Sequence, residues 1–162
     1  MKHVFIGIGS NLGDRQRNCS DAVERLKDIQ GCRFIGCSSW YLTSPVGMKD
    51  QDWFVNGVAC LNAGITARDL LARLLSIEAA MGRIRKEKWG PRVIDLDLLL
   101  CGSDILDEQD LKIPHPYMHL RRFVLGPLAE VAPDVIHPVL GKTASRLLQE
   151  LREEDQLVTV LE

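Results

Sequence analysis

Two aspartates lie two residues apart inside a strongly apolar run. Residues 89–100 read WGPRVIDLDLLL and contain Asp95 and Asp97. Because side chains alternate between the faces of a β-strand, both carboxylates share one face, and the even-numbered residues through Leu100 share the other. Two like charges at this spacing repel unless a proton or a cation neutralises them. Mg²⁺ commonly binds one or two carboxylates together with substrate phosphates, so the pair is a candidate magnesium site. The alternative is that both aspartates lie on the solvent-exposed face of a sheet that packs against the core on its other face only.

A cluster of basic residues comes directly before the aspartates. Arginine forks bind phosphate oxygens in pairs, and together with Mg²⁺ they suit phosphoryl transfer, in which positioning and charge neutralisation supply most of the catalysis. Trp89 lies within the same stretch and could exclude water or cover a flat ring. The alternative is a solvated surface run. The basic residues are Arg83, Arg85, Lys86, Lys88 and Arg92.

Glu78 is a carboxylate on a predicted helix. It lies four residues after Leu74 and seven after Leu71, which places it on or beside the packed stripe of that helix. It either borders the core or faces the arginines and orders the basic segment. The sequence leaves both possibilities open.

Three familiar motifs are present only in part. GIGSNLG is one residue too long for the dinucleotide-binding pattern, and GKT at 141–143 lacks the upstream glycine of a phosphate-binding loop. Thr143 is instead predicted to cap a helix. His115 and His119 could lie one turn apart, but Pro116 breaks the zinc-protease pattern. We therefore predict neither a Rossmann site nor a zinc site.

The pattern of apolar residues predicts the elements that must position these groups. Strand and helix alternate in a βαβ…βαβ order, which favours an α+β sandwich of ferredoxin-like kind, a mostly antiparallel sheet covered by helices. We expect a single domain over residues 1–162. Strands are predicted near 3–10, 32–43, 53–62, 93–101 and 157–161, with a further extended piece over ILDEQDLKIPHP at 105–116. Helices are predicted from the end of SNLGDR through Ile29 and near 66–82, 123–131 and 143–151.

Composition excludes several classes of protein. The chain is 46% hydrophobic and 26% charged with a net charge of −2, which argues against disorder and gives no electrostatic case for nucleic acid as a partner. No apolar run approaches the roughly 20 residues of a membrane span. The five cysteines lack the Cys-x-x-Cys spacing of zinc or redox sites, so we expect a cytoplasmic protein.

Seven segments together resemble the 6-hydroxymethyl-7,8-dihydropterin pyrophosphokinase family. They run in order over roughly residues 3–137, and WGPRVIDLDLL is the most specific of them. The resemblance implies an ATP-dependent diphosphotransferase that moves the β,γ-pyrophosphoryl group of ATP onto the pterin hydroxymethyl group in folate biosynthesis and releases AMP. The segments are GSNLGD, YLTSPVG, FVN, IEAAMGRIR, KWGPRVIDLDLLL, IPHPYM and RRFVLGPLAEVAP.

The resemblance also implies roles for individual residues. Asp95 and Asp97 resemble the ligands of two Mg²⁺ ions, with ATP as co-substrate, and Arg83 and Arg92 resemble the arginines that act on the transferring group. The ATP-contacting set comprises Glu78, Arg85, Lys88, Trp89, Arg92, Leu98, His115, Tyr117 and Arg121. The pterin-binding set comprises Thr43, Ser44, Pro45, Val46, Gly47, Phe54, Asn56, Trp89, Asp95 and Phe123.

Two other classes of function compete with this interpretation. Ferredoxin-like sheets also form RNA-binding modules, but the chain lacks the aromatic RNP signature and is slightly acidic. A different metal-dependent nucleotide enzyme, such as a cyclase or nuclease, could use the same carboxylates, and only the pocket residues separate it from a pterin enzyme. We expect a monomer that binds ATP and hydroxymethyldihydropterin, with neither nucleic acid nor membrane as a partner.

Overall fold

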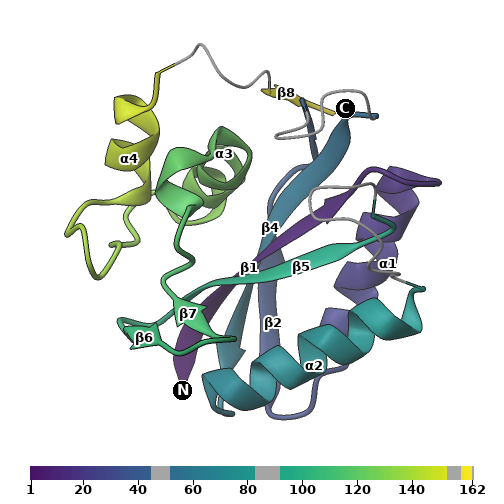
Figure 1. Ribbon diagram of the computed structural model, residues 1–162, viewed down its shortest axis with the longest axis horizontal. Helices are drawn as coiled ribbons and strands as arrows, with labels where there is room; N and C mark the ends of the chain where they lie inside the picture. The colour runs from purple at the N-terminus through teal and green to yellow at the C-terminus, as the bar shows by residue number, and fades with distance from the viewer. Residues whose placement is uncertain (45–51, 83–91, 153–157, 162) are drawn as a thin grey trace.

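The computed structural model describes residues 1–44, 52–82, 92–152 and 158–161. Within these ranges, helices and strands alternate in the predicted order, which confirms the α+β sandwich (Figure 1). The extended stretch predicted near 32–43 forms two separate strands. The elements are β1 (Lys2–Ser10), α1 (Arg15–Lys27), β2 (Cys32–Cys37), β3 (Tyr41–Thr43), β4 (Phe54–Ala63), α2 (Ala67–Ala80), β5 (Asp95–Cys101), β6 (Leu106–Asp107), β7 (Lys112–Ile113), the 3₁₀ turn η1 (Met118–Leu120), α3 (Arg122–Val131), α4 (Ala144–Glu150) and β8 (Val158–Val160).

The main sheet is antiparallel between every pair of strands described. Its order is β5-β1-β4-β3-β8, and β2 also pairs with β4. The long β4 pairs with β3 through its first residues and with β2 through its last ones. Helix α1 leads from β1 to the β2 side of the sheet and α2 leads from β4 to β5, which is the split βαβ arrangement of ferredoxin-like folds. A small hairpin of β6 and β7 follows β5.

The two faces of the sheet pack against different helices. Ile6 and Ile8 of β1 lie in the cluster covered by α1 and α2, whereas Phe5 lies in the opposite cluster with residues of α3 and α4. Figure 1 shows these helix pairs on opposite sides of the sheet. Burial of both apolar faces provides the main driving force for folding. The second face also carries the candidate site.

A β-bulge changes the expected alternation at the end of β5. Asp97 pairs with Gly7 and Leu98 with Ile6, but Leu100 then pairs with Phe5, so one extra residue is inserted. Leu100 was predicted to share a face with Leu98 and instead packs in the α3/α4 cluster. That prediction is wrong because the bulge places the consecutive residues Leu99 and Leu100 on the same face and so reverses the side-chain alternation after Leu99.

Local capping interactions begin two helices where the sequence predicts. The hydroxyl of Thr66 accepts a hydrogen bond from the backbone N–H of Asp69, and Thr143 does the same for Arg146. Thr143 is therefore a helix cap, as predicted. In the described part of the chain, no helix is both long and apolar enough to span a bilayer.

Candidate active site

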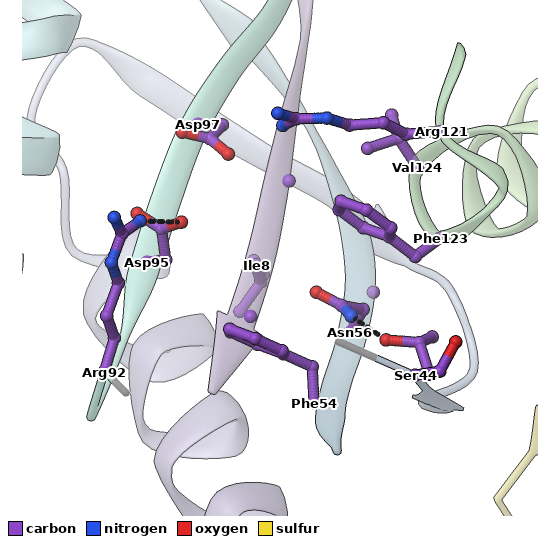
Figure 2. A pocket seen from close by; sticks show the side chains of 14 residues that line it. Ile8, Ser44, Phe54, Asn56, Arg92, Asp95, Asp97, Arg121, Phe123 and Val124 are labelled. Carbon is purple, nitrogen blue, oxygen red and sulfur yellow. Dashed lines mark hydrogen bonds and ion pairs between the residues drawn. The ribbon is translucent and has the colours of Figure 1, made fainter. Parts of the chain in front are cut away.

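A pocket opens on the sheet face that carries α3, and it is bordered by two aromatic rings and an amide. Phe54 begins β4 and Phe123 lies in the first turn of α3, with Asn56 between them in Figure 2. Asn56 Nδ2 donates a 2.5 Å hydrogen bond to the hydroxyl of Thr43, which is buried on β3. Because this bond fixes the amide, its oxygen is directed into the pocket (Figure 2). Two rings around an amide suit a flat heterocycle with a polar edge.

The floor of the pocket is the backbone of β1, which sequence reasoning missed. Gly7 pairs with Asp97 and Gly9 pairs with Asp95, so the glycines and the aspartates lie on the same sheet face. A Cβ on Gly9 would lie 2.6 Å from Asn56 Oδ1. Alternating glycines in a strand were the available signal, since they indicate that another group approaches the backbone closely. The other lining residues absent from the predicted set are Ile8, Gly57 and Val124.

The predicted carboxylate pair lies at the edge of this pocket. Asp95 and Asp97 both line it, together with Arg92 and Arg121. Arg92 Nη1 donates to Asp95 Oδ2 at 3.0 Å, and Figure 2 shows Arg121 extending toward Asp97.

Electrostatics at the pair favour a bound cation. Burial, and next the negative charge of Asp95, raise the pKa of Asp97 to about 7, while Arg121 opposes the shift. Burial also lowers the pKa of the Arg121 guanidinium, and the two aspartates oppose that change. A divalent cation would relieve the repulsion between the carboxylates. Within the described ranges, no group of three or more acidic, histidine or cysteine side chains is placed to hold a metal ion. Mg²⁺ commonly binds one or two carboxylates and takes its other ligands from water and substrate phosphates.

A second cavity lies on the other side of the aspartates, between α2, β5 and the segment after β6. Four residues of the predicted ATP set line it, namely Glu78, Arg92, Leu98 and His115. Arg92, Asp95 and Asp97 line both cavities. The structure thus places the carboxylate pair where two separate binding spaces meet.

His115, Tyr117 and Arg121 form one polar and aromatic group beside the second cavity. Burial, and next the charge of Arg121, lower the pKa of His115 to about 4, so its imidazole is neutral at pH 7. His115 Nδ1 accepts a hydrogen bond from the backbone N–H of Tyr117 at 3.2 Å. The guanidinium of Arg121 lies 5.4 Å from the ring centroid of Tyr117 and 5.6 Å from that of Phe123. Arg121 therefore links this group to the aromatic pocket.

Glu78 is directed at the aspartate strand. Its side chain is 3% exposed, and Oε2 accepts a 2.8 Å hydrogen bond from the backbone N–H of Leu96. The structure confirms the first of the two possibilities, a position bordering the core, whereas the basic residues 83–91, which the second concerns, lie outside the described residues. The Glu78 carboxylate is buried at the edge of the core, against β5.

Several predicted site residues lie outside the described residues. On the phosphate side these are Arg83, Arg85, Lys88 and Trp89, and on the pterin side they are Pro45, Val46 and Gly47. Of the neighbouring predicted residues, Thr43 and Ser44 line the aromatic pocket.

The described residues form an α+β protein with two cavities that share an acidic pair, an arrangement that suits an enzyme acting on two small substrates. Residues 5–133 match the family described as 7,8-dihydro-6-hydroxymethylpterin-pyrophosphokinase (HPPK). The chain belongs to this family.

Relatives extend over most of the chain. A protein of Methylorubrum extorquens named 2-amino-4-hydroxy-6-hydroxymethyldihydropteridine pyrophosphokinase is 43% identical over 152 residues, which is 93% of this chain and 94% of the relative. A Pseudomonas aeruginosa protein of the same name is 41% identical over 138 residues, 85% of each chain.

Solved structures support the fold. The crystal structure of wild-type Plasmodium falciparum HPPK-DHPS with pterin and p-hydroxybenzoate superposes with a TM-score of 0.73 at 15% identity. The match covers 92% of this chain and 41% of that one, so this chain spans about two-fifths of the solved protein. At this identity the likeness concerns the fold alone.

Proposed function

We propose that the two cavities bind the two substrates of a pyrophosphokinase. As a member of this family, the protein transfers pyrophosphate from ATP to 6-hydroxymethyl-7,8-dihydropterin in folate biosynthesis, and AMP is released. The pterin occupies the pocket between Phe54 and Phe123, and ATP occupies the cavity bordered by Glu78 and His115. The observation that carries this assignment is that Arg92, Asp95 and Asp97 line both spaces. The reacting groups of two bound substrates could meet there, as proximity catalysis requires.

The proposed pterin site uses stacking and a fixed amide. The rings of Phe54 and Phe123 stack on the heterocycle, and Asn56 binds its polar edge. Since Thr43 already accepts one bond from Asn56 Nδ2, the amide oxygen is the group available on the pocket side to accept a hydrogen bond from an N–H of the pterin. The segment Ser44 to Gly47 completes this site in the proposal.

The proposed phosphate site combines two Mg²⁺ ions held by Asp95 and Asp97 with cationic side chains. Asp95 and Asp97 would hold these ions, and bound Mg²⁺ would supply neutralisation of the phosphate charge. The pterin hydroxyl oxygen forms the new bond to the β-phosphorus of ATP and its proton is released to solvent, while the bond between that phosphorus and the oxygen bridging to the α-phosphate breaks, and AMP leaves with this oxygen. Arg92 and Arg121 orient the polyphosphate and stabilise its charge.

The remaining proposed contacts complete the ATP side. His115 is neutral at pH 7 and can donate a hydrogen bond to the nucleotide through Nε2–H, because Nδ1 already accepts from Tyr117. Arg83 acts on the transferring group in this proposal, and Arg85, Lys88 and Trp89 contact ATP, as the family resemblance implies.

We further infer that the protein works as a cytoplasmic monomer with one domain over residues 1–162, and that neither nucleic acid nor a membrane is its partner. The five cysteines are free thiols, which suits a reducing compartment.

The test is an assay of nucleotide products. Purified protein is mixed with Mg²⁺, ATP and 6-hydroxymethyl-7,8-dihydropterin, and the nucleotides are separated by chromatography. We expect AMP in a one-to-one ratio with pterin pyrophosphate, and no AMP when the pterin is omitted. ADP as the product, or no pterin-dependent product at all, would contradict the proposed function.

A further inference from the structure

Asn11, the residue directly after β1, joins two segments that are far apart in the sequence. It is 2% exposed. Its backbone N–H donates to the carbonyl oxygen of Arg92 at 3.0 Å, and its Oδ1 accepts from the backbone N–H of Arg92 at 2.8 Å. Its Nδ2 donates to the carbonyl oxygen of Asp52 at 3.2 Å. One buried amide therefore sets the position of Asp52 relative to Arg92.

Each of these segments leads directly into one of the two cavities. Asp52 precedes Phe54, the aromatic residue at the start of β4, and Arg92 precedes Asp95 at the start of β5. The segment before β4 has a second support, because Arg15 Nη1 donates to the carbonyl oxygen of Trp53 at 2.6 Å. Asn11 differs from Arg15 in that it contacts both the aromatic side and the phosphate side of the site.

The side chain at this position must both donate and accept. An asparagine amide does so with adjacent atoms, whereas an aspartate would lose the donor and turn a carboxylate oxygen toward the carbonyl of Asp52. An alanine would leave both the Arg92 N–H and the Asp52 carbonyl without this partner. Buried groups that lose a partner destabilise the arrangement that needed it.

We propose that Asn11 is a positioning residue that couples occupation of the ATP cavity to occupation of the pterin pocket. Phosphate bound to Arg92 restricts the motion of the Arg92 backbone, to which Asn11 is hydrogen-bonded. Because Asn11 is also hydrogen-bonded to the Asp52 carbonyl, the position of Asp52 and of the start of β4 is restricted as well. The coupling is reciprocal, as any linkage between two binding sites must be. This inference rests on the proposed function, since it takes the two cavities as the sites of the two substrates.

The test measures the coupling itself. Pterin affinity is determined by calorimetry for the wild type, Asn11→Ala and Asn11→Asp, each with and without Mg²⁺ and α,β-methylene ATP. Asn18→Ala is the matched control. Asn18 Nδ2 donates to Leu12 O at 2.9 Å and to Ser10 Oγ at 3.3 Å, so it supports the same turn without contacting Arg92 or Asp52. Thermal unfolding of all variants shows how much each loses in stability alone.

We expect the nucleotide analogue to tighten pterin binding in the wild type and in Asn18→Ala. The coupling ratio is the pterin Kd without the analogue divided by the pterin Kd with it. In both Asn11 variants this ratio should be about 5- to 30-fold smaller than in the wild type, the factor that corresponds to one or two lost hydrogen bonds. A wild-type coupling ratio in either Asn11 variant would overturn the inference. So would an Asn18→Ala protein that loses as much coupling as the Asn11 variants at the same melting temperature. The assay for AMP separates the two proposals. If the wild type makes AMP but Asn11→Ala keeps the full coupling ratio, the proposed function stands and only the role of Asn11 is refuted.

Discussion

Glu78 Oε2 accepts a 2.8 Å hydrogen bond from the backbone N–H of Leu96, the residue between the two aspartates. Helix α2 is thus hydrogen-bonded to β5 at Leu96, and the neighbouring side chains of Asp95 and Asp97 point to the opposite face of the sheet. The bond also brings a third carboxylate near the pair, and the charge of Glu78 contributes to the raised pKa of Asp97. The position of the acidic pair therefore depends on a buried contact on the far side of the sheet.

Replacing Glu78 tests this support. Glu78→Ala removes the acceptor of a buried N–H, so the free energy of unfolding should fall by about 1–3 kcal/mol. Glu78→Gln keeps a carbonyl oxygen that can accept the same bond, so its loss should be smaller. Urea unfolding followed by circular dichroism measures both. Equal losses in the two variants would show that the hydrogen bond to Leu96 is not what stabilises the strand.

The raised pKa of Asp97 predicts how stability varies with pH in the absence of metal. Folding raises this pKa from 3.8 to about 7, so between these values the folded state holds a proton that the unfolded state has released. The contribution to stability is therefore complete below about pH 4 and is lost as the pH rises toward about 7. Asp97→Asn removes this dependence, so we expect the variant to match the wild type in acid and to exceed it in melting temperature near pH 8.

A second acid provides the control for that experiment. Asp107 is exposed, and its hydrogen bond to Lys112 lowers its pKa, so its effect on stability has the opposite sign and falls in the acid range. Asp107→Asn should leave the difference in melting temperature between about pH 5 and pH 8 unchanged. If Asp97→Asn shows the full wild-type slope over this range, burial of Asp97 does not perturb its protonation.

The floor of the aromatic pocket can be tested with two glycines of one strand. In Gly9→Ala the new Cβ would lie 2.6 Å from Asn56 Oδ1, so the amide must move, and pterin affinity should fall by about tenfold or more. In Gly7→Ala the nearest atom is on Leu99 at 3.5 Å, an ordinary contact, so packing tolerates the change. Titration with pterin in the presence of a nucleotide analogue compares the variants. Equal affinities would contradict a binding role for the Asn56 oxygen.

Variants of Arg92 test its contribution to kcat/KM and its contribution to the free energy of unfolding. The ion pair between Arg92 and Asp95 leaves only about a quarter of each side chain exposed, so Arg92→Ala should lower the free energy of unfolding by about 1–3 kcal/mol, because the Asp95 carboxylate loses this partner. The same variant should lower kcat/KM by about 100-fold or more, because it removes charge stabilisation where both cavities meet. Arg92→Lys keeps the charge without the fork, and we expect intermediate activity. A variant Arg92→Ala with wild-type kcat/KM would exclude Arg92 from the reaction.

Predictions from local sequence succeeded where the interaction itself is local. The placement of Asp95 and Asp97 on one face follows from strand alternation, and the caps at Thr66 and Thr143 follow from hydroxyls that bond within the next turn. Phe54 and Phe123 are far apart in the sequence, and only the family resemblance brought them together before the structure did.

Features that depend on a partner distant in the chain could not be predicted this way. The bulge that redirects Leu100 arises from the pairing of β5 with β1, and nothing within β5 marks it. The contact of Glu78 with Leu96 needs α2 to be docked on β5. Asn11 appeared in the sequence analysis only within the segments GIGSNLG and GSNLGD, because its partners lie at Asp52 and Arg92.

The most direct test is a crystal structure of the protein with Mg²⁺, α,β-methylene ATP and 6-hydroxymethyl-7,8-dihydropterin. The account predicts Mg²⁺ bound to Asp95 and Asp97, the triphosphate against Arg92, and the pterin ring between Phe54 and Phe123 with its edge on Asn56. A triphosphate bound away from both carboxylates, or a pterin outside the ring pair, would contradict it.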